Sequence, residues 1–374
     1  MRTRTREATV AVSVSALALS LTACGSLLGS DDDGESQTER KGDAVTVGLL
    51  LPEAETARYE KFDHPIIEKQ VKQLTNGKGK LVYANADEDA AKQSNQLDQM
   101  VADKVDAILV SAVDAKKIAP SVKKAKEADI PVIAYDRLAE GPVSGYVAFD
   151  NELVGQVQGQ AILKALGSGN RQNSKIVMIN GSPTDPNAAV FKEGALSQLQ
   201  NQVDIAKSYD TEGWKPKAAG SHMTEAITEI GKDNIAAVYS ANDGMAGGAI
   251  KALKAAGLTD LPPVTGQDAE LPAVQRIVTG EQYMSVYKPY PEEAVGAAEM
   301  AVRIAQGRMV EYDALAGDSS DNATTKNIPS LLVSVRPLTR DTIKSTVIKD
   351  GIYNTKEICT AEFKAACATV GLKG

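Results

Sequence analysis

Short apolar runs alternate with amphipathic segments along most of the chain, and this alternation limits the possible folds more than any other feature. In the first half, runs rich in β-branched residues are separated by segments whose apolar residues recur at spacings of three and four. Near-continuous apolar strands of this kind fit a parallel sheet that helices cover on both faces. The pattern therefore predicts a doubly wound α/β domain, with strands over Val45–Leu51, Lys80–Ala84, Ala107–Ser111 and Pro131–Tyr135 and helices over Ala57–Leu74, Glu88–Asp103 and Lys116–Ala128.

The same alternation restarts in the second half of the chain. Two successive series of strands and helices indicate two similar lobes. Two more apolar runs, Tyr283–Tyr287 and Leu331–Val335, are predicted as strands that cross between the lobes. The second series predicts strands over Lys175–Ile179, Ile205–Tyr209, Ala236–Ser240 and Pro263–Gly266, and helices over Asn151–Leu166, Asn187–Gln200, Ala218–Ile230 and Asp243–Ala256.

The N-terminal residues have the pattern of a secretion signal. Three arginines are followed by an apolar run, Ala8–Leu21, that ends in small residues before Cys24. The sequence Leu21-Thr22-Ala23-Cys24 is similar to a bacterial lipobox, in which the cysteine is acylated and becomes the first residue. An ordinary signal peptide with an incidental cysteine is the alternative. We expect a signal peptide over residues 1–23 and, because residues 24–43 are polar, a solvated tether after it.

Charge and cysteine content narrow the function further. Without residues 1–23, which hold three arginines and one glutamate, the 41 basic and 49 acidic residues fall to 38 and 48, a formal charge of −10. An acidic chain without a basic stripe argues against a nucleic-acid partner. In an oxidising compartment, Cys359 and Cys367 predict a structural disulfide, with two free buried thiols as the alternative.

Polar side chains follow the predicted strands of both lobes. In open α/β sheets, ligands bind beyond the carboxyl ends of the strands and beside helix N-termini. Asp and Asn at such places also serve as helix N-caps, but arginine gains nothing in that role. We therefore expect one cleft lined from both lobes by the polar residues that follow the strands. These residues are Arg58, Tyr59, Asn85, Asp87, Asp136, Arg137, Asp185, Asn187, Asn242, Asp243, Gln267, Asp268 and Lys288.

These residue types suit a neutral, polyhydroxylated ligand. Each sugar hydroxyl both donates and accepts hydrogen bonds, so the site needs carboxylate acceptors as well as cationic donors. Tyr59 and Trp214, the only tryptophan, are candidates for stacking on the C–H face of a sugar ring, with core packing as the alternative for Trp214.

Other chemistries find less support in the sequence. The phosphate-binding glycine motifs and the nucleophile-elbow motif are absent, and the two histidines, His64 and His222, lack metal-ligand spacing. We therefore expect no cofactor and no metal. The residue types are also compatible with a pair of catalytic carboxylates like that of a glycosidase. The cationic side chains expected beside these carboxylates favour a binding site over that alternative.

Seven stretches within residues 45–353 form a recognisable set in this order: Ala134–Arg137, Phe149–Asn151, Gly181–Asn187, Asn242-Asp243, Gly266–Ala269, Val286–Pro289 and Val347–Gly351. Together they resemble the xylose-binding and multiple-sugar-binding proteins of the ribose-type (type I) periplasmic binding family. Carried over residue by residue, the resemblance implies sugar contacts from Arg58, Asp136, Arg137, Asp185, Asn187, Asn242, Asp268 and Lys288, with Tyr59 stacking on the ring. Glu212-Gly213-Trp214 is similar to the xylose binders, whereas Pro52–Ala57 is closer to the multiple-sugar binders.

The family's fold implies two lobes joined by three crossovers. It places residues 44–150 with 288–330 in the first lobe and 151–287 with 331–374 in the second, with Lys288 at a crossover. The tail after Tyr353 extends beyond the family's usual end and is expected to brace the second lobe.

The resemblance implies a monomeric, non-enzymatic receptor, lipid-anchored outside the cell membrane, that closes around a monosaccharide and delivers it to an ABC permease with its ATPase subunit. D-xylose is the expected ligand. The alternatives are a multiple-sugar binder (glucose, galactose, arabinose) that also signals to a membrane receptor, and an enzyme acting on sugars.

Overall fold

The computed structural model describes residues 42–54, 56, 58–169 and 171–372. The predicted signal peptide, Cys24 and nearly all of the predicted tether lie outside these residues. Within the described part of the chain, no helix is both long enough and apolar enough to cross a membrane.

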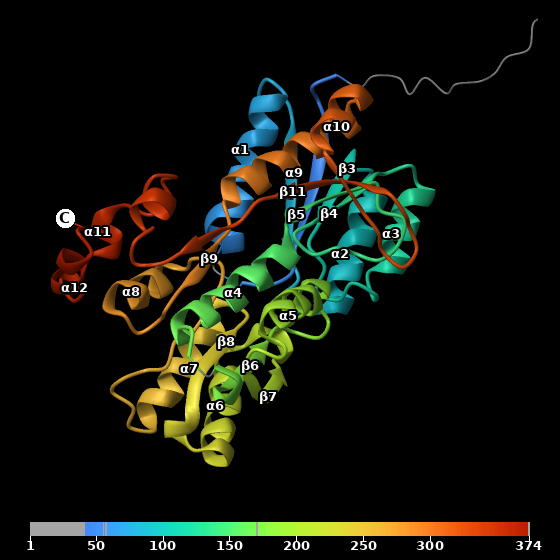
Figure 1. Cartoon of the computed structure of the whole chain (residues 1–374). Helices are drawn as coiled ribbons and strands as arrows, with labels where there is room; N and C mark the ends of the chain where they lie inside the picture. Colours follow the sequence, from blue (N-terminus) through green and yellow to red (C-terminus); the bar gives the residue numbers. More distant parts are fainter. Residues whose placement is uncertain (1–41, 55, 57, 170, 373–374) are drawn as a thin grey trace, which may run out of the picture. The chain divides into compact units, whose positions relative to one another are not determined.

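The first sheet contains seven strands among the described residues, in the order β10-β11-β5-β4-β3-β1-β2 (Figure 1). Only the edge pair β10–β11 is antiparallel. The central strands are short and fully buried, as expected for a sheet covered on both faces. The strands are β1 (Thr46–Leu51), β2 (Lys80–Asn85), β3 (Ala107–Val110), β4 (Val132–Tyr135), β5 (Gly145–Phe149), β10 (Asp318–Ser320) and β11 (Ile328–Val333).

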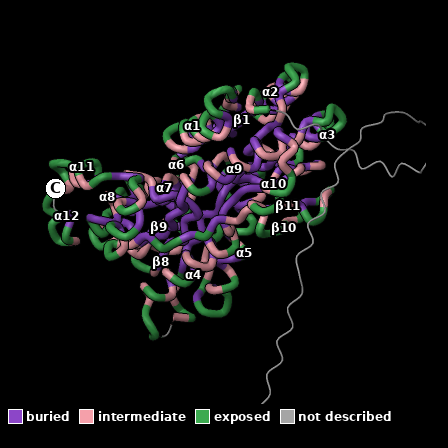
Figure 2. The backbone as a smooth tube through the Cα atoms, turned by 90° about the horizontal axis from the view of Figure 1, so that it is seen from above, coloured by how far each residue is buried: buried purple, intermediate pink, exposed green. Residues whose placement is uncertain are grey.

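Each face of this sheet has its own apolar core. Successive side chains of a strand point to opposite faces. Leu49 of β1 therefore packs in one core with α1 (His64–Leu74), α9 (Tyr290–Ala305) and α10 (Met309–Leu315). Leu50, the next residue, packs in the other core with α2 (Ala90–Ala102) and α3 (Ala119–Glu127). In Figure 2 the strands run through the buried interior, while the outer turns of the helices are exposed.

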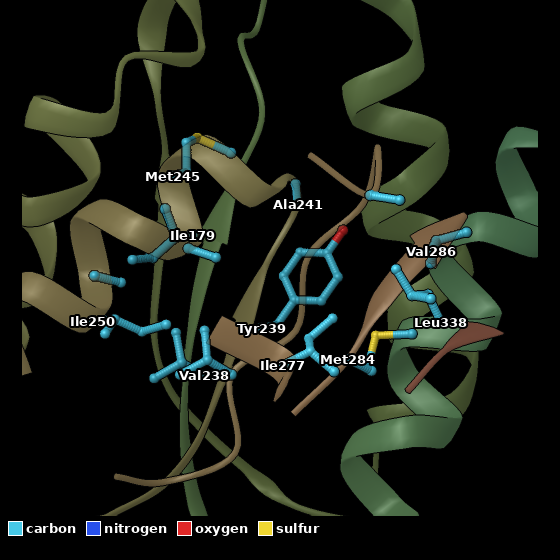
Figure 3. Close-up of a cluster of buried hydrophobic side chains, with 14 of the residues drawn as sticks. Ile179, Val238, Tyr239, Ala241, Met245, Ile250, Ile277, Met284, Val286 and Leu338 are labelled. Atoms are coloured by element: carbon cyan, nitrogen blue, oxygen red, sulfur yellow. The ribbon is translucent and has the colours of Figure 1, made fainter. Parts of the chain in front are cut away.

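The second lobe is built on the parallel sheet β7-β6-β8. Two isolated bridges, Val238–Val264 and Gln267–Val286, extend it toward the antiparallel pair β9–β12. Tyr239 of β8 lies within its core, close to Ile277 and Met284 (Figure 3). The strands are β6 (Lys175–Asn180), β7 (Asp204–Asp210), β8 (Ile235–Ser240), β9 (Ser285–Tyr287) and β12 (Arg336–Leu338), and the helices are α4 (Asn151–Leu166), α5 (Pro186–Leu199), α6 (Pro216–Ile230), α7 (Asp243–Ala255) and α8 (Leu271–Thr279).

The chain passes between the two sheets at three places: from β5 to α4, from β9 to α9, and from β11 to β12. Two parallel-sheet lobes joined by three crossovers are thus present, and the predicted fold class is confirmed. The assignment of every residue to a lobe remains a prediction.

Several predicted elements need correction. The strand expected over Leu331–Val335 lies at Ile328–Val333 and pairs with β5, so it belongs to the first sheet and our boundary at residue 330 divides it. The strand predicted over Pro263–Gly266 is reduced to one bridge at Val264. Pro262 and Pro263, directly before Val264, have no backbone N–H to donate to a neighbouring strand. β5 was not predicted; it is short and follows a loop of Gly, Pro and Ser.

The helix predicted over Ala57–Leu74 is also different at its start. A turn of π-helix, η1 (Tyr59–Asp63), precedes α1 and places Tyr59 and Asp63 inside the protein. Such turns often occur at functional sites.

The C-terminal segment packs on the second lobe. Its elements are η5 (Lys344–Ile348), α11 (Thr355–Ile358) and α12 (Lys364–Thr369), and the last two lie against α8 (Figure 1). The predicted disulfide is confirmed: Cys359 and Cys367 are bonded, with Cα atoms 5.9 Å apart. Cys367 and Ile358 are buried in the second-lobe core, so the tail braces that lobe as expected.

Candidate ligand-binding site

All ten predicted site residues line one cavity between the lobes. They follow the carboxyl ends of strands in both sheets, where helix N-termini and loops meet. None is more than 7% exposed. Thr56, Phe191 and Gln267 complete the lining. Gln267 was among the polar residues expected after a strand, whereas Thr56 and Phe191 were not singled out from the sequence. Asn85, Asp87 and Asp243, also expected after strands, do not line this cavity.

Arg58 is the most heavily paired of these residues. Its guanidinium lies 2.8 Å from Asp63 Oδ2, 3.4 Å from Asp136 Oδ1, and in contact with Glu293 of α9. Burial alone would lower the pKa of Arg58, but these carboxylates outweigh burial and raise it, so the side chain is a permanent cation. Asp63 and Glu293 were missed because neither follows a predicted strand.

Aromatic rings enclose the same guanidinium. The rings of Tyr59, Phe149 and Tyr290 have centroids 5.2, 5.3 and 5.1 Å from the Arg58 Cζ atom. Cation–π contacts within about 6 Å are stabilising, most of all when desolvated. Carboxylates and aromatic rings therefore hold the Arg58 side chain in one orientation in the cavity lining.

Asp136 is the central acceptor of the first lobe. Its Oδ2 accepts a hydrogen bond from Tyr59 Oη at 2.5 Å, and its Oδ1 faces Arg58. Burial raises the pKa of the Asp136 carboxyl, but Arg58, Lys288 and Arg137 together lower it below its ordinary value. The group is therefore an ionised acceptor.

Arg137 connects the two lobes. Its Nε lies 2.9 Å from Asp185 Oδ2, which belongs to the loop before α5. On the other side, Arg137 Nη2 lies 3.6 Å from Glu53 Oε1 of its own lobe. Glu53, a buried carboxylate after β1, was also missed by the sequence reasoning.

A second link joins the lobes through Asn187. Its Nδ2 donates to the main-chain oxygen of Asp136 at 2.9 Å, and its Oδ1 accepts from Asn151 Nδ2 at 3.0 Å. Both functions of the amide are thus used: its donor reaches across to the first lobe, and its acceptor is bound within the second.

Trp214 is shared between the cavity and the second-lobe core. Its Nε1 donates to Asp185 Oδ2 at 3.1 Å, and its ring packs edge-to-face on Phe191 with centroids 6.3 Å apart. Its ring also covers Gly181: a Cβ at that position would lie 2.0 Å from Trp214 Cη2. The sequence left ligand stacking and core packing open for this residue. The structure places its ring both in the cavity lining and in the second-lobe core, so stacking on a ligand remains a prediction.

Lys288, at the second crossover, approaches carboxylates of both lobes. Its Nζ lies 2.8 Å from Asp268 Oδ1 and 3.9 Å from Asp136 Oδ1. Asn242 lines the cavity nearby while its Oδ1 caps α7 by accepting from Met245 N at 2.9 Å. Asp185 caps α5 in the same way. For these two residues, the capping and site-lining interpretations both hold.

Backbone strain collects at the site. Asp136, Trp214 and Asp268 have φ values of 59°, 57° and 90°, in the left-handed region that side chains other than glycine rarely adopt. Such conformations cost about 1–3 kcal/mol each and persist only where surrounding contacts hold them. The backbone conformation of three of the ten site residues is thus strained, and it sets the direction of their side chains.

The charges of the lining balance. Asp136, Asp185 and Asp268 face Arg58, Arg137 and Lys288, so the cavity offers fixed acceptors and fixed donors without net charge. Within the described residues, no group of His, Cys, Asp and Glu is suited to hold a metal ion. His64 and His222 instead stack on Tyr83 and Tyr209.

Comparison with known proteins agrees with this geometry. A family model described as a periplasmic binding protein domain matches residues 47–309. The D-xylose-binding periplasmic protein of Escherichia coli K12 is 33% identical over 344 residues, covering 90% of this chain and 98% of that protein. The chain belongs to the type I periplasmic sugar-binding proteins.

Two other relatives belong with this family. The multiple sugar-binding periplasmic receptor ChvE of Rhizobium radiobacter is 30% identical, covering 84% of this chain and 93% of the receptor. A solved ABC transporter solute-binding protein of Clostridium phytofermentans, with bound β-D-glucose, superimposes with a TM-score of 0.76 at 26% identity, covering 84% of this chain and 99% of that one.

Family membership settles two of the sequence predictions. Periplasmic sugar-binding proteins are non-enzymatic transport receptors, so the prediction that this chain is not an enzyme is confirmed. The relatives are periplasmic, which supports a location outside the cytoplasm.

Proposed function

We propose that the protein is a lipid-anchored receptor of an ABC sugar importer that captures one monosaccharide, D-xylose, between its lobes. The observation that carries the proposal is the convergence of charged and amide side chains from both lobes on one charge-balanced cavity. A neutral guest with many hydroxyls can use every donor and acceptor there, whereas an ionic guest would disturb the balance.

Hinge closure is the second part of the proposal. The free volume between the site side chains is about 20 Å3, enough for about one water molecule. A sugar can therefore enter only if Arg137 and Asp185 separate and the lobes move apart. Closure around the bound sugar, with the three crossovers as hinge, would then present a new surface to the permease.

The choice of D-xylose rests on the relatives. Two D-xylose-binding periplasmic proteins are 33% and 32% identical to this chain. The stretch Pro52–Ala57, closer to the multiple-sugar binders, supports a second candidate: a receptor for several sugars that also signals to a membrane protein.

Calorimetric titration of the purified protein with D-xylose, L-arabinose, D-glucose, D-galactose and D-ribose tests the proposal. We expect saturable binding with D-xylose the tightest, and a change in Trp214 fluorescence, because this single tryptophan lines the cavity. Similar affinities for several sugars would favour the second candidate. Absence of binding across the panel would overturn both.

Closure and anchoring each have their own measurement. X-ray scattering should show a smaller radius of gyration with saturating sugar, and superimposable profiles would contradict hinge closure. In cells, Cys24→Ser should release the protein from the membrane fraction, whereas unchanged membrane association would contradict acylation at Cys24.

A further inference from the structure

A larger groove lies beside the ligand cavity and also runs between the lobes. It has a volume of about 930 Å3, near the top of the range of about 300–1,000 Å3 for small-molecule sites. Its walls come from the loops after β1 and β2 and from α2 on one side, and from the loops after β6 and β7 on the other. Arg137 and Trp214 line both the groove and the cavity, so the two spaces meet at these residues.

Glu53 lines the groove at this junction and has an unused acceptor. The residue is 2% exposed, and its Oε2 accepts from Thr56 N at 2.9 Å. Its Oε1 has no hydrogen-bond partner, since Arg137 Nη2 at 3.6 Å is beyond hydrogen-bond distance. Leaving a buried carboxylate oxygen unsatisfied is costly, so Oε1 is suited to accept a hydrogen bond from a ligand.

Three of the other carboxylates of the groove already have partners. Asp89 caps α2 by accepting from Ala91 N and Lys92 N, Asp114 accepts from two main-chain amides, and Glu88 lies 3.3 Å from Lys215 Nζ. Carboxylates outnumber cationic side chains six to three along the lining. This excess repels an anionic group and leaves hydroxyl donors as the suitable partners of Glu53.

We infer that the groove is a subsite for a second sugar unit, so that the protein binds a disaccharide as well as a monosaccharide. The inference rests on the proposed function. The first unit occupies the cavity and the second lies in the groove, where a hydroxyl donates to Glu53 Oε1. The separation of Arg137 from Asp185 that admits the first unit also opens the junction through which the glycosidic bond passes.

Calorimetric titration with matched pairs tests the inference: D-xylose against β-1,4-xylobiose, and D-glucose against cellobiose. We expect at least one disaccharide to bind within about tenfold of its monosaccharide, a difference of about 1.4 kcal/mol. Binding of a monosaccharide without either disaccharide would overturn the inference and leave the proposed function standing. Binding of neither class would overturn both.

A variant that fills the groove locates the second unit. Ala91 is exposed on α2 and lines the groove but not the cavity, so Ala91→Phe should weaken disaccharide binding by roughly tenfold or more, with monosaccharide affinity unchanged. The matched control is Ala102→Phe, at an exposed position of the same helix outside the groove, which should change neither affinity. Equal disaccharide affinities in the two variants would show that the second unit lies elsewhere.

Discussion

The guanidinium of Arg137 and the carboxylate of Asp185 meet across the lobes, with Nε and Oδ2 2.9 Å apart. Both side chains are almost fully buried. Their ion pair joins the loop after β4 in the first lobe to the loop before α5 in the second. Burial raises the pKa of the Asp185 carboxyl, and the charge of Arg137 opposes that rise. The pKa of Asp185 in the second lobe therefore depends on its contact with Arg137 of the first lobe.

This pair predicts non-additive losses of sugar binding. Arg137→Ala and Asp185→Asn should each weaken binding by about 1.5–3 kcal/mol, roughly 10- to 100-fold, because each removes a charged group from the cavity lining and leaves its buried partner without its nearest opposite charge. The double variant should lose less than the sum of the two, since neither charge is then stranded. Calorimetry measures all three, with exposed Arg340→Ala as the control. Strictly additive losses would contradict coupling through this pair.

The sequence located residues that line one cavity better than it located the boundaries of the elements around them. All ten residues selected with the help of the family resemblance line the cavity, whereas Asn85 and Asp87, which follow β2, do not. Parallel strands end at the same edge of a sheet, so polar residues there are recognisable, but their position alone does not say which of them reach the cavity. Asp63 and Glu293 were not recognisable: one lies inside a π-helical turn and the other on a helix 235 residues from its partner Arg58 in sequence. Apolar periodicity contains no information on such long-range pairing.

The predicted boundaries and sheet assignment of the strand near residue 331 were wrong for a related reason. β11 joins the first sheet although it is close in sequence to β12 of the second lobe, and a run of apolar residues does not specify which sheet it enters. The left-handed turns at Asp136 and Asp268 were equally hidden, because neighbouring tertiary contacts impose them on residues that have no strong preference for them.

Because the Trp214 ring packs directly on Gly181, adding one methyl group at position 181 should disturb both stability and sugar binding. In Gly181→Ala the new Cβ would lie 2.0 Å from Trp214 Cη2, and the ring is fixed by Asp185 and Phe191. We expect a lower melting temperature, weaker sugar binding and altered Trp214 fluorescence, because overpacking costs about 1–3 kcal/mol and the ring lines the cavity. Gly317→Ala is the matched control, since nothing lies within 4 Å of a Cβ at Gly317. Normal sugar affinity in Gly181→Ala would show that the ring position does not matter for binding.

The disulfide should stabilise the second lobe without affecting the site. It closes a loop between cysteines eight residues apart, for which the chain-entropy model gives roughly 2–3 kcal/mol. Replacing both cysteines by serine should lower the melting temperature in calorimetry, while sugar affinity at ambient temperature stays unchanged, because α11 and α12 lie against α8 and none of their residues lines the cavity. A large loss of affinity would instead implicate the tail in lobe closure.

Asp243 predicts how stability depends on pH. This fully buried carboxyl accepts hydrogen bonds from Gln282 Nε2 at 2.7 Å, Ser285 Oγ at 2.8 Å and Glu270 N at 3.0 Å, and so holds the segment that carries Asp268. Burial raises its pKa from 3.8 to about 7, although Arg276 opposes the rise. Between these values the folded state holds a proton that the unfolded state has released. The free energy of unfolding should therefore fall as pH rises from about 4 to about 7.

Asp136 contributes with the opposite sign. Its folded-state pKa is lowered, so its stabilisation is present above its ordinary pKa and is lost as pH falls through the folded value. Melting temperatures across about pH 4 to 8 should then be highest under mildly acidic conditions and decline toward neutrality. In Asp243→Asn, whose side chain resembles the protonated acid, the decline toward neutrality should flatten. Exposed Asp233→Asn should keep the wild-type profile. If Asp243→Asn instead declined as steeply as the wild type, another group would have to carry the pH dependence.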